Sequence, residues 1–378
     1  MARSAQAYVR GTTVQFYKWL EESSGKLPAG PPVWICGDCH VGNLGPLADA
    51  KGRVAIQIRD LDQTVIGNPA HDIIRLGLSM ASAARGSDLP GVTTAKILEQ
   101  LISGYQTSLR ADFDMPHDKS HRPPAIQQLL VSAIRRRWRH LALERLETVK
   151  PKLPLGKRFW ALGKMERSKL AELLKQEAVR KMVMTLQERD DDAPVELVDA
   201  AYWIKGCSSL GRLRYAAMLR VGKLRTGSLC LLDIKEATKS AAPRAAEAAM
   251  PKDNAMRVVN GAKALSPNVG ERMMAGRLLD TAVVIRELMP QDLKIEVDRL
   301  NREEAMSLAF YLAGVVGRAH GRQMDRATRN SWLSELARAR TVSLDAPSWL
   351  WSSVVELISI HEAAYLEHCR RFALAEAA

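Results

Sequence analysis

Apolar residues follow two different spacings along this chain, and the alternation between them predicts a mixed α+β fold. Positions three and four apart are apolar over 1–25, 72–84, 256–265 and 303–322, which is typical of helices with one buried face, and a last helix is expected from about residue 347. Shorter continuous apolar runs, bounded by Gly, Pro and polar residues, predict strands. These strands are expected at 33–36, 54–58, 215–221, 229–235 and 281–289.

The character of the chain changes near residue 199, where we expect a boundary. Residues 91–190 are helical in pattern and basic, and the stretch 190–194 is typical of an exposed linker. A chain of 378 residues exceeds the length at which one hydrophobic core usually stops growing. We therefore expect two lobes: a helical one formed by 1–198 and the C-terminal helices 291–378, and a β-rich one formed by 199–290.

Composition narrows the classes of protein to consider. The formal net charge of +13 implies attraction to anions such as ATP, a phosphorylated metabolite or RNA. No apolar stretch is long enough to span a membrane, and the first residues do not resemble a secretory signal. The five cysteines are few and odd in number, which favours free thiols and a cytoplasmic location.

Two of the cysteines form a C-x-x-C-H pattern, Cys36 to His40, which is also the pattern of covalent haem attachment. Haem attachment would require export, and Cys36 ends an apolar run that is expected to be a buried strand. Zinc would require a second Cys/His pair at ligand spacing, and none follows. We therefore interpret this loop by its other polar residues.

Polar acceptors follow two of the predicted strands. Asp38, His40 and Asn43 come after the first run, and Asp60 and Asp62 come after the second, with turns at 44–46 and 51–52 between the runs. If the two strands are adjacent, these acceptors can share a divalent cation and position a hydroxyl group for attack. We expect Asp38 and His40 to be catalytic and Asn43, Asp60 and Asp62 to bind the metal ion. For His40, a structural role in the loop is the alternative, and for Asp62, a solvated strand end.

A small-residue loop and a lysine in the β-rich segment complete this chemistry. The loop 206–211 lies between two predicted strands, and Lys235 ends the next strand, as in the phosphate-binding arrangement of kinases. We expect the phosphates to be bound by Gly206, Ser208, Ser209, Gly211 and Lys235, and the adenine to be received by the backbone near Glu287 and Met289.

The stretch 37–43 resembles the GDxHxxN loop of aminoglycoside phosphotransferase-like and choline-kinase-like enzymes, and 58–72 resembles their metal-binding segment. Most of 8–325 is similar to the bacterial domain of unknown function 2252 family, since 8–11, 206–211, 234–237, 257–259 and 318–322 follow that family's order of motifs. The resemblance implies a two-lobed protein kinase-like α+β fold. It also implies ATP and Mg²⁺ as cofactors, and transfer of the γ-phosphoryl group to a hydroxyl of a small molecule.

The order of the motifs is reversed relative to an ordinary kinase, because Asp38 precedes Lys235. A circular permutation explains this order, and such permutations are tolerated where chain ends lie close together at the surface. On this reading 1–198 carries the catalytic loop with a helical insertion, and 199–290 is the nucleotide-binding lobe.

Several alternatives stay open at this stage. Ser208 replaces a glycine of the kinase loop, and Asn260 stands where an acid would pair with Lys235, so that either Glu247 substitutes, phosphate alone holds the lysine, or the site is degraded. A catalytically weak nucleotide-binding regulatory protein is one alternative. A nucleic-acid-binding module is another, suggested by the basic cluster 135–139. Transfer of AMP instead of phosphate, the acceptor and the oligomeric state are not readable from the residues.

Overall fold

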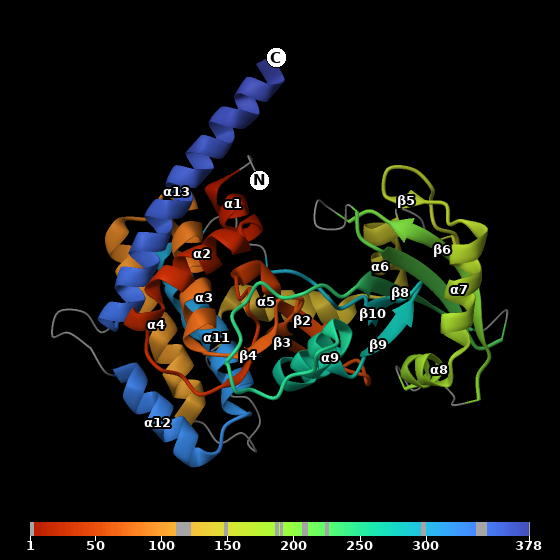
Figure 1. Cartoon of the computed structure of the whole chain (residues 1–378), viewed down its shortest axis with the longest axis horizontal. Coiled ribbons are helices and arrows are strands. Elements are labelled where there is room, and N and C mark those ends of the chain that lie inside the picture. The colour runs from red at the N-terminus through yellow and green to blue at the C-terminus, as the bar shows by residue number, and fades with distance from the viewer. Residues whose placement is uncertain are drawn as a thin grey trace.

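Hydrophobic side chains gather in three buried cores, and these divide the molecule into a helical part and a sheet part (Figure 1). The computed structural model describes residues 4–110, 122–146, 150–185, 189, 192–205, 211–223, 227–295, 300–337 and 346–377. Helices and antiparallel sheets occur together in these residues, as the two apolar spacings predict. The fold is therefore mixed α+β.

Segments from both ends of the chain build the helical part. Figure 1 shows N-terminal and C-terminal helices packed together there, with both chain ends on this part. Its helices are α1 (Ala5–Gly11), α2 (Thr13–Ser23), α3 (Ala70–Gly86), α4 (Gly91–Arg110), α11 (Arg302–Gly321), α12 (Arg326–Ala337) and α13 (Ser348–Ala377). The single helix expected over 1–25 is two helices, because the backbone leaves helical geometry at Thr12. A short 3₁₀ turn (Ser24–Lys26) follows α2.

The helices α4 and α11 pack against each other unusually closely. A Cβ atom at Gly104 would lie 2.0 Å from the carbonyl oxygen of Phe310, and one at Gly317 would lie 2.3 Å from Ser108 Oγ. Only glycine permits this approach. The apolar face predicted for 303–322 is confirmed, since Leu308, Leu312, Val315, Val316 and Ala319 are all buried.

Two small antiparallel sheets carry the acidic loops, and their pairing differs from the expectation. Strand β1 (Val33–Ile35) pairs with β4 (Val65–Gly67), whereas β3 (Val54–Ile58) pairs with β2 (Leu44–Ala48). The two apolar runs are therefore not paired neighbours, and residues 44–48 form a strand instead of the expected turn. Pro46 is accommodated in this strand, which pairs on one side only.

A six-stranded antiparallel sheet forms the other part, in the order β5-β6-β7-β8-β10-β9. The strands are β5 (Phe159–Trp160), β6 (Val195–Trp203), β7 (Arg214–Val221), β8 (Ser228–Glu236), β9 (Met273–Leu278) and β10 (Thr281–Leu288). Both faces are covered. Ala217 and Leu219 of β7 pack with α7 (Lys164–Lys175) and α8 (Glu177–Met184), while Ala216 and Met218 pack with α6 (Trp138–Leu146). This alternation follows from the two-residue period of a strand.

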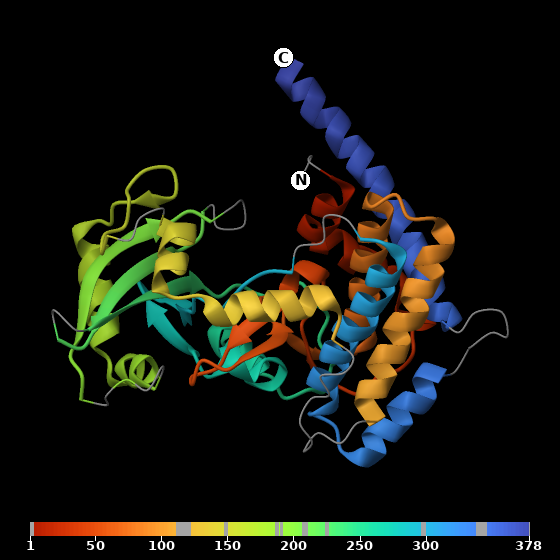
Figure 2. The same cartoon turned by 180° about the vertical axis from the view of Figure 1, so that it is seen from behind.

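Three further helices lie between the two parts. They are α5 (Pro124–Arg135), α9 (Asn254–Leu265) and the short α10 (Pro267–Gly270). Figure 2 shows α5 crossing from the sheet part toward the helical part. The sheet part begins before residue 199, because α7, α8 and β5 pack or pair with its strands.

A chain of buried polar side chains connects four helices of the helical part. Trp332 Nε1 donates to the hydroxyl of Tyr105 (3.2 Å), this hydroxyl lies 2.9 Å from His320 Nδ1, and His320 Nε2 lies 3.1 Å from Asp72 Oδ2. All four residues are about fully buried. One arrangement of hydrogen bonds satisfies every contact: Tyr105 donates to His320 Nδ1, and His320 Nε2 donates to Asp72.

We predict that Tyr105→Phe destabilises the protein by about 1–3 kcal/mol, because it leaves His320 without a donor and Trp332 without an acceptor. Urea unfolding at pH 7 measures the change. Tyr8→Phe, a change outside this chain of hydrogen bonds, is the matched control and is expected to stay near wild type. Equal stability of both variants would contradict this account of the buried network.

Candidate functional site

The loop after β1 is fixed by one buried carboxylate. Asp72, in the first turn of α3, accepts hydrogen bonds from the backbone N–H groups of Cys36 (2.7 Å) and Gly37 (2.9 Å). Gly37 has φ +75°, and a Cβ atom there would lie 2.3 Å from the carbonyl oxygen of Gln63. A glycine is therefore required at this turn. The side chain of Asn43 closes the loop by donating to the carbonyl of Asp38 (2.9 Å).

The carboxylate of Asp38 is oriented by a fully buried arginine. Arg75 Nε donates to Asp38 Oδ1 (3.0 Å), and Arg75 Nη2 donates to the carbonyl of Val9 (2.8 Å). The second carboxylate oxygen lies 4.0 Å from His40 Nε2. Burial lowers the pKa of His40 to about 4, against the opposing effect of Asp38, so the ring is neutral at pH 7. His40 borders Asp38 as an uncharged group.

Asp60 and Asp62 lie opposite Lys235, where the helical part and the sheet part face each other. Lys235 forms an ion pair with Asp62, and the backbone N–H of Asp62 donates to Asp60 Oδ1 (3.3 Å). Burial acts to raise the pKa of the Asp60 carboxyl group, but the charges of Lys235 and Arg286 outweigh it, so this pKa lies below its usual value. Asp60 is therefore ionised at neutral pH. The acid that pairs with Lys235 is Asp62, and not Glu247.

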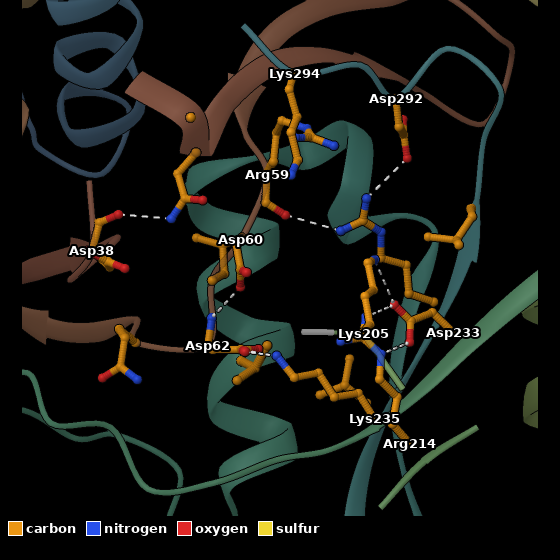
Figure 3. A pocket seen from close by; sticks show the side chains of 18 of the residues that line it. Asp38, Arg59, Asp60, Asp62, Lys205, Arg214, Asp233, Lys235, Asp292 and Lys294 are labelled. Carbon is orange, nitrogen blue, oxygen red and sulfur yellow. Dashed lines mark hydrogen bonds and ion pairs between the residues drawn. The ribbon is translucent and has the colours of Figure 1, made fainter. Parts of the chain in front are cut away.

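These groups line one cavity of about 730 Å³ between the helical part and the sheet part (Figure 3). Such a volume suits a ligand of nucleotide or metabolite size. The residues expected in the site that line it are Asp38, His40, Asn43, Asp60, Asp62, Lys235 and Met289. The structure thus brings together residues from positions 38–62 with a lysine of β8 and the end of β10.

The same cavity carries a second charged group that the sequence reasoning missed. Arg214 of β7 binds both carboxylate oxygens of Asp233 on β8, and Lys205 lies 3.9 Å from the same carboxylate. Lys205 also lies 4.7 Å from the centre of the Trp203 ring. Burial lowers the pKa of Lys205 to about 7, against the effect of Asp233. The sequence does contain a signal for this second charged group, because Asp233 interrupts an otherwise apolar strand.

Residues 1–371 match the family described as "Uncharacterized protein conserved in bacteria (DUF2252)". The chain belongs to this family. No curated protein and no solved structure matches it. The family match agrees with the order of motifs in the sequence, and it assigns no reaction to this DUF2252 chain.

The other residues expected in the site are not among those that line the cavity in the described part of the chain. In this family member, the carboxylate of Glu287 accepts hydrogen bonds from Arg189 (2.8 and 2.9 Å), and its carbonyl accepts one from Arg272 (2.8 Å). Its side chain does not border the cavity. Gly206, Ser208 and Ser209 lie outside the described residues. Gly211 is described, with φ +73°, in the turn before β7.

Four of the five cysteines of this family member lie in the described part of the chain, and all four are free thiols, as expected. Cys36 and Cys39 are fully buried, and the hydrogen bond with Cys39 together with burial raises the pKa of Cys36. Buried, protonated thiols are poor nucleophiles. These cysteines pack beneath the loop that carries Asp38.

Metal-binding clusters and membrane-spanning helices were both sought in the described residues. Among them, no cluster of three or more His, Cys, Asp and Glu side chains is placed to hold a metal ion. None of the helices that the structure describes has the length and apolar character needed to cross a membrane. A metal ion at Asp60 would therefore need ligands beyond acidic side chains.

We predict that the protein loses stability when the pH falls from 7 to 5. Burial lowers the pKa of His40, His71 and His361 to about 4 in the folded chain, whereas the unfolded chain binds protons near pH 6.5. Acidification through this window therefore favours unfolding, by about 2 kcal/mol for each fully buried histidine. Urea unfolding at both pH values measures the loss.

The variant His361→Gln is expected to flatten part of this pH dependence, because it removes one buried titrating ring. His140→Gln is the control, since His140 is exposed. A wild-type stability that does not change between pH 7 and 5 would contradict the neutral buried state of these rings.

Proposed function

We propose that this chain is a magnesium- and ATP-dependent phosphotransferase that moves the γ-phosphoryl group to a hydroxyl of a small molecule. The observation that carries the proposal is the cavity itself. Asp38, Asn43 and Asp60 line it together with Lys235, although nearly two hundred positions separate them in the sequence. Phosphoryl transfer needs three kinds of group, which these four residues can supply: a residue that positions the hydroxyl, metal ligands and a cation on the phosphates.

Asp38 is assigned to the acceptor hydroxyl. One of its oxygens is held by Arg75, and the other faces the neutral His40, so that the carboxylate has a fixed direction. It orients the hydroxyl oxygen toward the γ-phosphorus and accepts its proton. As the new oxygen–phosphorus bond forms, the bond to the β-phosphate oxygen breaks and ADP leaves. His40 limits the space beside Asp38 and carries no charge.

Asn43, Asp60 and Asp62 are assigned to Mg²⁺. Carboxylate and amide oxygens are ligands that Mg²⁺ accepts, and Mg²⁺ in such sites completes its shell with water and substrate phosphates. The small number of acidic groups therefore fits a metal ion that arrives with a nucleotide. When bound, Mg²⁺ would neutralise the charge that develops on the phosphates. Asp62 is shared, since it also pairs with Lys235.

The permuted kinase-like fold belongs to the same proposal. The side chain of Gln323, just after α11, accepts from the backbone N–H of Trp34 (2.8 Å) and donates to its carbonyl (3.1 Å). Residue 323 thus lies beside the strand that leads into the Asp38 loop. If the chain of an ordinary kinase is cut at this point and its original ends are joined, the motifs follow in the order found in this sequence. The sheet order, with the strand of Lys235 between the β6–β7 hairpin and the β9–β10 hairpin, also supports this fold.

A nucleotide-binding regulatory protein is the second candidate. The observation in its favour is that Asp62 neutralises Lys235 directly, and that Asn260 supplies no charge on α9. Such a protein would bind ATP without transferring phosphate. The nucleic-acid alternative has less support, because Arg136 of the basic cluster is bound to the carbonyl of Pro290 (2.5 Å) and to Glu144.

We predict that Asp60→Asn lowers magnesium-dependent ATP turnover by on the order of 100-fold or more, because it removes the charge of a metal ligand. Lys235→Met is expected to weaken ATP binding and turnover together. Turnover is measured as ADP release with a library of hydroxyl-bearing metabolites, and nucleotide affinity by calorimetry with and without Mg²⁺.

Asp88→Asn is the control for a lost carboxylate. Asp88 is exposed, with φ +56°, which asparagine also adopts, and it lies outside the cavity. ATP binding without turnover in the wild type would favour the regulatory candidate. Absence of magnesium-dependent ATP binding in the wild type would reject both.

A further inference from the structure

Basic side chains from five different segments converge on one wall of the cavity. We name this set the basic wall: Arg59 after β3, Arg145 of α6, Lys205 after β6, Arg214 of β7 and Arg286 of β10. Figure 3 shows Lys205 and Arg214 on the opposite side of Asp60 from Asp38. The basic wall is therefore separate from the place assigned to the acceptor hydroxyl.

Several donors of the basic wall have no acceptor. The Nε atoms of Arg59, Arg145 and Arg286 are buried without a hydrogen-bond partner. In the part of the chain that the structure describes, no ion pair involves the guanidinium group of Arg59. Buried polar groups are nearly always paired in native proteins, and a buried unpaired cation is costly. Unpaired Nε atoms also occur outside the cavity, in Arg122, Arg189 and Arg257, but those of Arg59, Arg145 and Arg286 belong to residues that line it, where a ligand can supply the acceptors.

The acids near the basic wall are already engaged. Asp233 is bound by Arg214 through both oxygens. Asp292 accepts from Arg286 (3.1 Å), and it also binds the fully buried Arg272 through both oxygens (3.0 and 3.2 Å). Arg145 is paired with Glu144 (3.0 Å), so three carboxylates, with Asp60 close by, serve the five cations of the basic wall and Arg272. The local charge is positive without a ligand.

The carbonyl of Arg59 holds Arg286 in place. Arg286 Nη1 donates to this carbonyl (3.1 Å), and Arg286 Nη2 is fixed by Asp292. The guanidinium group is therefore oriented before any ligand arrives. Planar guanidinium groups match the oxygens of a phosphate group, and oriented donors lose little freedom on binding.

We propose that the basic wall is a binding subsite for a phosphate group, beyond the residues assigned to phosphoryl transfer. This group belongs either to the phosphate chain of the nucleotide or to a phosphorylated acceptor. An apolar surface near β8 and β10 would suit an adenine ring. A phosphate subsite accounts for the charged residues that stand there.

The test uses sulfate as the probe, because sulfate keeps the same charge between pH 5 and 9 and needs no nucleotide or metal. Sulfate is titrated by calorimetry into the whole protein at low ionic strength with a chelator present. We expect Arg59→Met and Lys205→Met each to weaken sulfate binding by at least about tenfold, the effect of losing a charged hydrogen bond. Sulfate should also raise the Tm of the wild type, and should do so far less in these variants.

Arg53→Met is the matched control. This variant also removes one arginine charge, six positions before Arg59 in the sequence. Arg53 is exposed and lies outside the cavity. Arg59→Met is expected to fold with a Tm near that of the wild type, because Arg59 is half-buried and its buried Nε atom has no acceptor to lose. Lys205→Met keeps the apolar stem over Trp203. Sulfate affinities that are equal in the wild type and both variants, or lowered equally by Arg53→Met, would overturn the proposal.

A second titration distinguishes the two sources of phosphate. Sulfate that competes with magnesium–ATP indicates that the basic wall holds the phosphate chain of the nucleotide. Sulfate that binds with the same affinity in the presence of saturating magnesium–ATP indicates a phosphorylated acceptor. Both results support the subsite. Because the first titration contains no ATP, its outcome is independent of whether the proposed phosphoryl transfer occurs.

Discussion

The buried carboxylate of Asp72 is the constraint on which the arrangement of the site depends. It is fully excluded from solvent, so its charge must be balanced by hydrogen bonds inside the protein. Two of these hydrogen bonds come from the backbone of the loop that carries Asp38, and a third comes from His320. Tyr105 contacts His320 in turn, and Trp332 donates to Tyr105. The packing of α3, α4, α11 and α12 is therefore transmitted directly to the loop. A shift of these helices would move the backbone beside Asp38.

The cavity exists because two separately packed parts of the chain face each other. The acidic loops belong to the helical part, whereas Lys235, Arg214 and Asp233 belong to the six-stranded sheet. The ion pair between Lys235 and Asp62 and the bond from Arg286 to the carbonyl of Arg59 cross the interface. Apolar contacts join the parts as well, since Met273 of β9 and Val284 of β10 belong to the same hydrophobic core as the helical part.

Without a ligand, the basic wall contains buried hydrogen-bond donors that no group of the protein satisfies. The helical network satisfies each of its donors and acceptors, while Arg59, Arg145 and Arg286 keep buried donors unpaired. Departures from full hydrogen bonding in native proteins concentrate at functional sites. Deep burial also lowers the pKa of Arg59 to about 10, with a further contribution from Arg286. The folded chain therefore holds repulsive charges where a ligand would relieve them.

The sequence by itself determined the α+β class, most helices and half of the ten strands that the structure describes, and it placed Asp38, Asn43 and Asp60 after two of these strands, because apolar spacing and local polar motifs depend on near neighbours. The structure confirms the buried face of 303–322, and it corrects the turn at 44–46 to a strand. Strand pairing, the partner of Lys235 and the set of residues in the basic wall were decided only by the tertiary structure. Arg59, Arg145 and Arg286 are separated by many positions, and each is ordinary in its local context. Only the packing of the sheet against the helical part places their charges on one cavity.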